Sequence, residues 1–396
     1  MPPAFPFVVS LASGAIDVVW PEDAGINRTR IASNGRWPVW NPTRDLIAYS
    51  RLEQQDGRTI SEVQLSDLTG RHLRTLHETP QGVAGMIAPN LPHYACWSPA
   101  GDMLAIVAQG QFGLTLFLSD IDGILQSDPI INGAPLFISW CTDNNFLSVH
   151  SGLEFAVVET AGSRATANVA EQAAGFRAAA FSDDANILAY VLPTNGKMGL
   201  MRAHFQGTGS RLVSDIFAGP TSLAFRPSTE QLSVCVSHEP DSGIFDEVWM
   251  VDLAQDPAPE PVRIARGPFA ALWWSPTGHA FAQLVPLQTG DGRYAMQIRD
   301  PEGRFLAATE GFLPSPDFQL TAAFFDQYGQ SHHAWAPDGS GMLLSGRLSG
   351  DAVSRSWGDS VGDYVLYWPA KSGTPLEILC PGQSAFFPPA AKRVHG

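Results

Sequence analysis

Charged residues are scarce in this sequence. Only 16% of the 396 residues are Asp, Glu, Lys or Arg, and the basic ones are fewer, with 24 Lys and Arg against 39 Asp and Glu. The formal net charge of −15 repels phosphate backbones and anionic headgroups, so we expect neither nucleic acid nor a membrane surface as a partner. No apolar run reaches the roughly 18 residues that a membrane-spanning helix needs.

Cysteine is also scarce, and its pattern excludes two kinds of site. Cys96, Cys141, Cys235 and Cys380 lie far apart, form no C-x-x-C pair and fall within apolar runs. We interpret them as buried reduced thiols rather than as metal ligands or a redox pair. The first residues, MPPAFPFVVSLASGA, lack the positive segment of a secretory signal, so we expect a cytoplasmic protein.

Turn residues and a repeated pattern, by contrast, are abundant. The chain has 37 Gly, 31 Pro and 44% hydrophobic residues, a composition typical of β-proteins with many tight turns. Seven segments align on an aromatic anchor followed by a polar turn and an apolar strand, as in HHAWAPDGSGMLLSGR. The anchors, spaced by 57, 43, 41, 44, 49 and 61 residues, are Trp40, Trp97, Trp140, Phe181, Phe225, Trp274 and Trp335. Such a period predicts a fold built from stacked repeats.

Each repeat has the pattern of four short strands. In the sixth repeat these are ALWWSP, HAFAQLVP, RYAMQIRD and RFLAAT, separated by Pro- and Gly-containing turns. No helical periodicity persists for three turns, so we expect an all-β protein. Four-stranded antiparallel units of about 40–50 residues are β-propeller blades, which pack radially because no blade can bury both faces alone.

The two chain ends complete the blade count. The segments FPFVVSL, AIDVVWPEDAG and NRTRIAS match strands two to four of a blade, and QSAFFPPA matches an innermost strand with Phe387 as its anchor. A blade closed by a strand from each end removes the unpaired edges that invite aggregation. We therefore predict one propeller domain of eight blades over residues 1–396, with seven blades as the alternative.

The anchor segments WAPDGSGMLLSG, WSPAGDMLAIV and WSPTGHAFAQL resemble the TolB-like, or PD40, class of β-propeller repeats. The resemblance covers nearly the whole chain and implies the fold. It leaves the activity open, because related propellers serve as scaffolds and as gating domains of prolyl-oligopeptidase-type hydrolases. TolB itself is exported and typically has six blades and a separate N-terminal domain, features not found in this sequence. A G-x-S-x-G nucleophile elbow is also missing.

Three long segments fall between predicted strands, at 77–92, 312–331 and 347–363. In a propeller, the connections from fourth to first strand and from second to third strand emerge on one face, and these segments occupy such connections. Loops longer than about 12–15 residues are usually functional or disordered. Because two of the three carry aromatic residues, we expect this loop-rich face to be functional.

The mouth of the central channel is a second candidate site. The residues four positions before each anchor are expected to line it, namely Arg36, His93, Leu136, Arg177, Thr221, Ala270, Ser331 and Gln383. Arginine binds carboxylate or phosphate through a bidentate fork, so a funnel containing Arg36, His93 and Arg177 favours an anionic ligand. The predicted ligand-binding set is Arg36, His93, Arg177, Tyr328, Ser331, His332 and Gln383.

Two functions of different classes remain open. The first is a non-catalytic scaffold that binds a protein or peptide through the loop-rich face. The alternative is a lyase, hydrolase or cyclase that acts on an anionic small molecule at the channel mouth, with His93 or His332 as general base and Tyr328 as acid. We expect no metal, because adjacent His332 and His333 point to opposite faces of a strand, and no cofactor.

Overall fold

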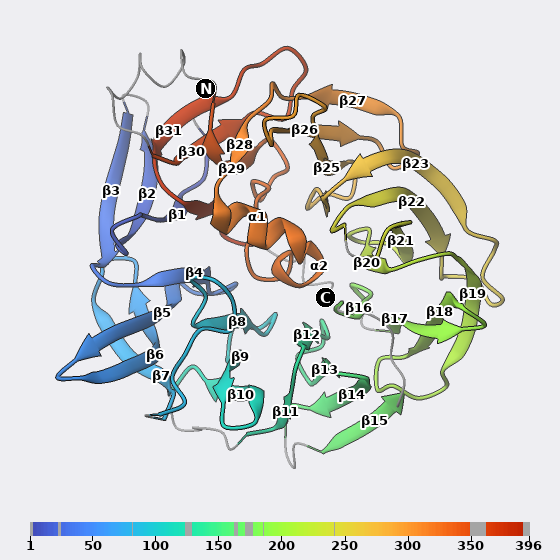
Figure 1. Ribbon diagram of the computed structural model, residues 1–396, viewed down its shortest axis with the longest axis horizontal. Helices are drawn as coiled ribbons and strands as arrows, with labels where there is room; N and C mark the ends of the chain where they lie inside the picture. The colour runs from blue at the N-terminus through green and yellow to red at the C-terminus, as the bar shows by residue number, and fades with distance from the viewer. Residues whose placement is uncertain are drawn as a thin grey trace.

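The computed structural model describes residues 3–22, 25–80, 82–122, 129–161, 165–170, 177–184, 186–240, 242–348 and 362–390. These residues form eight four-stranded antiparallel sheets arranged as a ring around a central axis (Figure 1). The fold is therefore the predicted all-β propeller, and the blade number is eight rather than seven.

The blades follow one another along the chain, and blades 2 to 8 each run from an innermost to an outermost strand, whereas the innermost strand of blade 1 comes from the end of the chain. Blades 1 to 4 consist of β1 (Phe7–Ser10), β2 (Ile16–Glu22), β3 (Gly25–Ala32) and β32 (Ser384–Phe386); β4 (Arg36–Trp40), β5 (Leu46–Gln55), β6 (Arg58–Asp67) and β7 (His72–Glu78); β8 (His93–Trp97), β9 (Met103–Gly110), β10 (Gly113–Asp120) and β11 (Ile131–Gly133); and β12 (Leu136–Trp140), β13 (Phe146–Ser151), β14 (Glu154–Glu159) and β15 (Thr166–Ala170).

Blades 5 to 8 repeat the same order. They consist of β16 (Ala180–Phe181), β17 (Ile187–Thr194), β18 (Lys197–His204) and β19 (Arg211–Phe217); β20 (Thr221–Phe225), β21 (Gln231–Val236), β22 (Phe245–Asp252) and β23 (Val262–Phe269); β24 (Ala271–Trp274), β25 (Phe281–Pro286), β26 (Tyr294–Arg299) and β27 (Phe305–Ala308); and β28 (Leu313–Pro314), β29 (Met342–Arg347), β30 (Tyr364–Trp368) and β31 (Glu377–Pro381).

Blade 1 is closed by the two ends of the chain, as predicted. Strand β32 pairs antiparallel with β1, with Val8 opposite Phe386 and Ser10 opposite Ser384. Phe386 is 3% exposed and the anchor Phe387 is fully buried. The C-terminal strand thus supplies the innermost strand that the N-terminal segment lacks.

The repeated tryptophan anchors connect neighbouring blades. The indole N–H of Trp40 donates to the carbonyl of Phe386, and those of Trp140 and Trp335 donate to the carbonyls of Cys96 and Trp273. In each case the acceptor lies on the innermost strand of the preceding blade. Such a partner satisfies the N–H of a buried indole, which gives a physical reason for Trp at these three anchors, whereas the buried N–H of the anchor Trp97 has no partner among the described residues.

The segment 312–331, expected to be a loop, instead contains helices α1 (Pro316–Ala323) and α2 (Phe325–Tyr328). It interrupts the innermost strand of blade 8. The strand begins as β28, leaves the sheet, and returns at Ala334, whose carbonyl accepts a hydrogen bond from Leu343 N. We call residues 315–332 the channel insertion, because its helices lie at the centre of the ring in Figure 1.

The helices escaped the sequence analysis because they are too short for a periodic pattern over three turns. A local signal was nevertheless present. Ser315 is the N-cap of α1 and accepts a hydrogen bond from Phe318 N, Pro316 follows it and Asp317 lies in the first turn. This order of residues is typical of a helix start.

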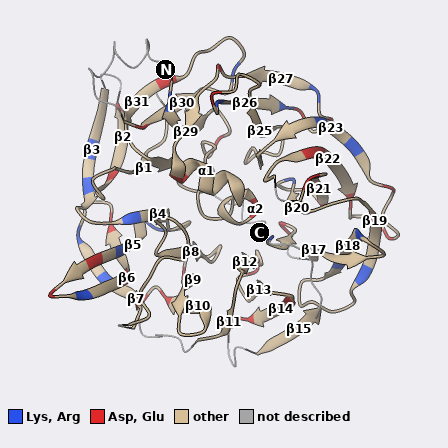
Figure 2. Ribbon diagram, in the orientation of Figure 1, with Lys and Arg blue, Asp and Glu red and all other residues tan. Residues whose placement is uncertain are grey.

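Charged side chains are concentrated toward the outside of the ring. Figure 2 shows Lys and Arg on outermost strands such as β3, β19 and β23, and few charges around the helices at the centre. Within the described ranges, no helix combines the length and hydropathy that crossing a bilayer requires.

Candidate functional site

Aromatic side chains from six blades surround the channel insertion. Ring centroids lie 4.5 to 6.4 Å apart in the pairs Phe386–His332, Trp37–Tyr328, Tyr94–Tyr328, Phe137–Phe324, Phe245–Phe325 and Trp273–Phe325. Aromatic pairs at such distances add favourable contact energy to the burial of the rings. The insertion therefore packs as part of the protein core.

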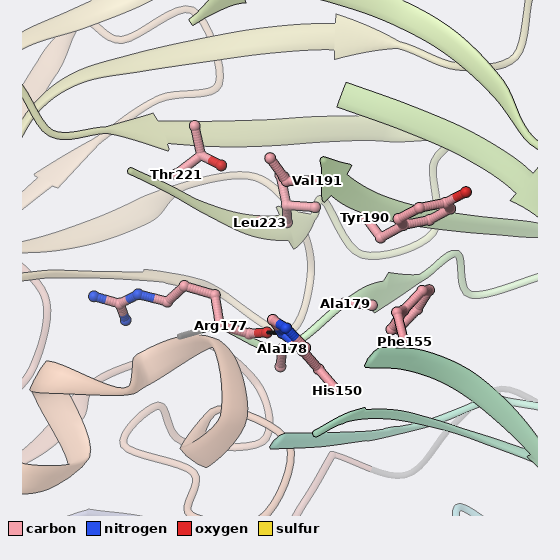
Figure 3. A pocket seen from close by; sticks show the side chains of 9 residues that line it. All are labelled: His150, Phe155, Arg177, Ala178, Ala179, Tyr190, Val191, Thr221 and Leu223. Atoms are coloured by element: carbon pink, nitrogen blue, oxygen red, sulfur yellow. Dashed lines mark hydrogen bonds between the residues drawn. The ribbon is translucent and has the colours of Figure 1, made fainter. Parts of the chain in front are cut away.

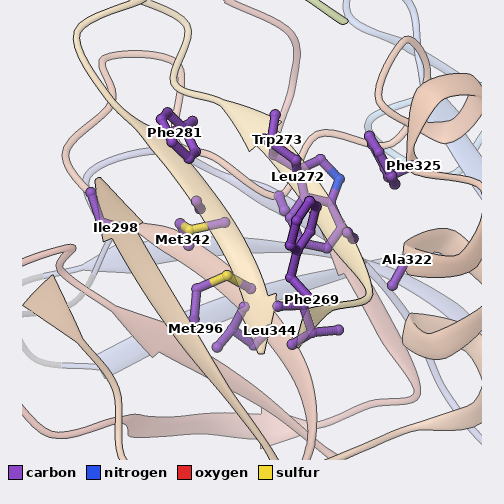
Figure 4. Close-up of a cluster of buried hydrophobic side chains, with 14 of the residues drawn as sticks. Phe269, Leu272, Trp273, Phe281, Met296, Ile298, Ala322, Phe325, Met342 and Leu344 are labelled. Atoms are coloured by element: carbon purple, nitrogen blue, oxygen red, sulfur yellow. The ribbon is translucent and has the colours of Figure 1, made fainter. Parts of the chain in front are cut away.

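The hydrophobic side of the insertion joins a core shared by blades 6, 7 and 8. Phe318, Ala322 and Phe325 belong to the same buried cluster as Trp273 of blade 7 and Met342 of blade 8. Figure 4 shows Ala322 and Phe325 reaching from the helices toward the strands that carry Leu272 and Trp273. The channel is thus filled by side chains at this level.

Polar side chains of α2 and the turn after it pair with the free edge of an innermost strand. The Oε1 atom of Gln327 accepts a hydrogen bond from Ile138 N at 3.0 Å, and that of Gln330 accepts one from Trp140 N at 3.2 Å. An innermost strand has no further strand on its channel side, so its backbone groups there need other partners. The two glutamines supply them for β12.

Arg177, a predicted ligand residue, is bound by the insertion. Its guanidinium lies 3.3 Å from the Asp326 carboxylate, donates to the carbonyl of Ala323 at 2.7 Å and lies over the Phe245 ring. Asp326 also accepts a hydrogen bond from Ala178 N, and its side chain is only 1% exposed. The positive charge expected to bind an external anion is therefore neutralised within the protein.

Tyr328, Ser331 and His332 lie together at the end of the insertion. Ser331 Oγ is 2.7 Å from His332 Nδ1 and donates to the hydroxyl of Tyr94 at 3.3 Å. Burial, and then nearby His333, lowers the pKa of His332 to about 3. Burial, and then the Asp317 carboxylate, raises the pKa of Tyr328.

His93 lies elsewhere, in a buried network between blades 2 and 3. Its two ring nitrogens are 3.1 Å from Ser61 Oγ and 3.1 Å from Ser50 Oγ, and Thr79 Oγ1 connects it to His77. Burial, with a smaller contribution from His77, lowers the pKa of His93 to about 3. Burial also lowers the pKa of His77 to about 4.

Of the remaining two predicted residues, Gln383 of blade 1 contacts the insertion, and Arg36 of blade 2 acts on it through its charge. Gln383 contributes its backbone carbonyl, which accepts a hydrogen bond from Ser315 Oγ at 2.5 Å. Burial raises the pKa of the Asp317 carboxyl, and the positive charge of Arg36, half-buried at the start of β4, partly counteracts this rise. The predicted set is thus brought together around the insertion, except for His93.

A small pocket lies beside the insertion, between blades 4, 5 and 6 (Figure 3). It is lined by His150, Phe155, Arg177, Ala178, Ala179, Tyr190, Val191, Thr221 and Leu223, and its volume is about 20 Å³. Because His150 Nδ1 donates to the carbonyl of Arg177, the Nε2 atom of the neutral ring carries the lone pair, and the described residues offer no partner to it or to Thr221 Oγ1. A space of this size with two such atoms suits a buried water.

His150 and Asp326 were missed by the sequence analysis. His150 lies in the apolar strand FLSVHS, where nothing distinguishes it from a core residue. Asp326 lies in the helical insertion that was expected to be a loop. Among the described residues, no group of three or more His, Cys, Asp or Glu side chains is placed to hold a metal ion.

The geometry argues against His93, His332 and Tyr328 as proton carriers for an external substrate. A general base must come within hydrogen-bond reach of the substrate proton. These side chains are 1%, 4% and 3% exposed, and each is packed against protein groups. Ligand-accessible surface has to be sought outside the channel.

The loop-rich face offers three exposed apolar side chains on neighbouring blades. Met86, in the connection from β7 to β8, is 47% exposed, Phe112 in the β9–β10 turn is 81% exposed, and Leu153 in the β13–β14 turn is 68% exposed. All three connections are of the fourth-to-first or second-to-third type, so they emerge at the same end of their blades. We call Met86, Phe112 and Leu153 the apolar rim.

The loops that carry the apolar rim lie next to one another. The backbone at Gly85, next to Met86, lies beside Gln109, which precedes the Phe112 turn. Asn132 of β11 accepts hydrogen bonds from Thr115 of β10 and from Ser151, which precedes the Leu153 turn. The third long segment, 347–363, falls largely outside the described residues.

Comparisons with known proteins support the fold. A eukaryotic initiation factor matches over 97% of this chain and 98% of its own, at 12% identity and a TM-score of 0.52. The dihydro-heme d1 dehydrogenase NirN, solved in complex with DHE, matches over 97% and 74%, at 14% identity and a TM-score of 0.58. At such identities the likeness supports the fold alone and leaves the activity open.

The TolB-like resemblance is matched only coarsely. TolB from Acinetobacter baumannii superimposes over 87% of this chain and 83% of its own, at 13% identity and a TM-score of 0.41, which is too low to carry an argument. No protein-family model and no curated protein matches the sequence. The PD40 repeat family therefore remains a resemblance in the anchor motifs.

Proposed function

We propose that this propeller is a non-catalytic scaffold that binds a protein or peptide through the apolar rim of its loop-rich face. The observation that carries the proposal is the exposure of Met86, Phe112 and Leu153 on adjacent blades. Large apolar side chains grouped on a surface are typical of interaction sites, whereas single exposed ones are ordinary. Aromatic and Met side chains are also enriched in protein interfaces.

The filled channel supports a scaffold rather than an enzyme. A catalytic propeller would need an accessible site with an acid or base, and the residues first expected to serve are buried, Tyr328 and His332 within the insertion and His93 between blades 2 and 3. A rigid ring with a filled centre is suited to presenting loops at fixed positions.

The test is affinity capture with a rim variant. Phe112→Ser combined with Leu153→Ser removes two apolar side chains from turns whose backbones stay unchanged, so the fold should survive. We expect proteins captured by the wild type to be lost, because such side chains contribute most of the energy of an interface. Quantitative mass spectrometry of the captured proteins gives the readout.

A matched control comes from the outermost strand of blade 7. Phe305→Ser combined with Leu306→Ser removes side chains that are 56% and 48% exposed, at a distance from the loop-rich face. The control should keep every partner that the rim variant loses. If both variants capture the same proteins as the wild type, the rim is not the binding face.

We also propose that the protein works in the cytoplasm. Its four cysteines are unpaired and buried, which is typical of proteins in a reducing compartment. Burial raises the pKa of the Cys96 and Cys141 thiols to about 12, so neither is a reactive thiolate at neutral pH. Fractionation of cells that express the tagged protein tests this assignment.

A further inference from the structure

A groove lies between blades 6 and 7, and the wall that blade 7 contributes is largely polar. Strands β25 and β26 of blade 7 turn Gln283, Val285, Gln297 and Arg299 toward it, and the end of β23, from Arg266 to Phe269, forms the opposite wall. Side chains alternate between the two faces of a strand, so these i, i+2 pairs share one face of blade 7. The groove has a volume of about 220 Å³.

The opposite face of blade 7 is apolar. Ala282, Leu284, Met296 and Ile298, which alternate with the groove residues, belong to the core shared with blade 8. Faces between propeller blades normally bury apolar side chains, and burying polar ones costs free energy unless they find partners. The polar face is therefore a departure from what blade packing alone would favour.

Arg299 has only neutral partners among the described residues. Its Nε and Nη2 atoms donate to Gln283 Oε1 at 2.9 Å and Gln297 Oε1 at 3.4 Å, and Nη1 donates to the carbonyl of Gly303 at 2.9 Å. A guanidinium has five N–H groups, so Arg299 keeps N–H groups that can donate to a further acceptor. Burial lowers the pKa of Arg299, as expected for a cation without a carboxylate beside it.

Nearby acidic groups are already engaged by other arginines. Glu247 pairs with Arg263, and Asp300 and Glu302 both pair with Arg304. Arg266 is exposed, and the described residues give it no hydrogen bond or ion pair within normal distances.

The groove is consequently rich in hydrogen-bond donors. Because arginine only donates, the two glutamines turn their oxygens toward Arg299 and keep their amide N–H groups as donors. The φ of Gly267 is +117°, a value that favours glycine, and nothing lies within 4 Å of where a Cβ would stand. The groove is therefore open at this glycine, next to Arg266.

We propose that the groove between blades 6 and 7 binds a small anion through Arg266, Arg299 and the amides of Gln283 and Gln297. The ligand class is a compound with carboxylate or phosphate oxygens, which match the fork of a guanidinium. The volume is below that of pockets for drug-sized ligands, which favours a compact anion. The site is separate from the apolar rim, so its test does not depend on the scaffold proposal.

The experiment measures the affinity of the full-length protein for citrate and for inorganic phosphate, at constant ionic strength set with sodium chloride. Thermal shift and isothermal titration calorimetry report binding, because a ligand that binds only the native state raises its melting temperature. We expect saturable binding of at least one anion. The one that binds identifies whether carboxylate or phosphate is preferred.

Three variants test the assignment. Arg266→Gln and Arg299→Lys should each weaken binding about tenfold or more, since one removes a charge and the other the bidentate fork. Arg211→Gln on β19, which changes the net charge equally but breaks a surface pair with Asp256, should bind like the wild type. Arg266 is exposed, so its variant decides the matter even if Arg299→Lys folds poorly.

Two results would overturn the proposal directly, and a third would do so through the control. One is the absence of saturable binding of either anion by the wild type. The other is binding by Arg266→Gln that is as tight as that of the wild type, which would place the anion elsewhere. Equal weakening in Arg211→Gln would likewise show a general effect of charge.

Discussion

Blades 1 and 8 are neighbours, and both have an irregular innermost strand. Blade 1 takes its strand from the far end of the chain, yet its ladder is complete, because β32 pairs with β1 through three residues. Blade 8 keeps its strand in sequence order but interrupts it, so that β28 has only two residues and the helical insertion separates them from the part that returns at Ala334. One irregularity concerns connectivity alone, whereas the other changes the secondary structure.

The two blades depend on each other where they meet. Phe387 N donates to the carbonyl of His333, which follows the insertion, and Ser315 Oγ, which starts it, donates to the carbonyl of Gln383. The ring-closing strand and the channel insertion are therefore joined at both ends. Closure of the ring and filling of the channel are expected to be coupled.

The largest effect is expected from breaking the closure. Deletion of 383–396 removes β32, exposes the edge of β1 and loses the burial of Phe386 and Phe387, each worth about 2–3 kcal/mol. We expect aggregation or a large loss of melting temperature. Deletion of 391–396 leaves all of these contacts in place and should be nearly silent. If the longer truncation melts like the full chain, the closure contributes little to stability.

Acidification should lower the stability of the fold through buried histidines at two places, the channel insertion and the network between blades 2 and 3. His77, His93 and His332 are buried as neutral rings with pKa values lowered to about 4, 3 and 3. Below the unfolded-state pKa near 6.5 only the unfolded chain takes up these protons, so stability falls as the pH drops and levels off below about pH 3. Between pH 7 and pH 5 each of these histidines lowers the free energy of unfolding by about 2 kcal/mol.

Urea unfolding at the two pH values measures this loss. His332→Phe removes the contribution at the junction of blades 1 and 8, so its loss between pH 7 and pH 5 should be about one third smaller. An unchanged pH dependence in His332→Phe would mean that this ring does not remain neutral in the folded protein.

Removing the charge of Arg177 should cost about 3–5 kcal/mol. Arg177→Met keeps the packing of the side-chain stem and leaves the buried Asp326 carboxylate without its cation. Adding Asp326→Asn should recover part of the loss. The surface pair of Arg211 and Asp256 is the control, and Arg211→Met should cost about 0–1 kcal/mol. Denaturant titration of the wild type and these variants gives the free energies of unfolding that check the expected losses.

The smallest effect is expected for the edge of β12. Gln327→Leu leaves the N–H of Ile138 buried without an acceptor, which costs about 1–3 kcal/mol. Gln288→Leu changes an exposed glutamine in the connection from β25 to β26, which makes no side-chain hydrogen bond with the described residues, and should change stability by less than about 0.5 kcal/mol. Equal losses in the two variants would show that pairing of the strand edge is unimportant.

The sequence predicted where innermost strands begin, but not which groups surround the residues at those positions. Counting four residues back from each anchor correctly found the start of innermost strands such as β4 and β8, at Arg36 and His93. It could not show that Arg177 pairs with Asp326, because this contact joins segments about 150 residues apart. Nor could it show that Tyr328 and His332 are buried, because their burial depends on the insertion. The order Ser315, Pro316, Asp317 was the one local sign of a helix.

The sequence by itself determined the repeat, the four-stranded blades, their number and the closure by the two ends. The reason is that each depends on local alternation, turn residues and an aromatic anchor that recurs whatever lies around it. Only the tertiary structure decided that the channel is filled and that the polar groove between blades 6 and 7 is open. Whether a polar side chain is buried, paired or free depends on which distant groups the ring brings beside it, and no local pattern records that.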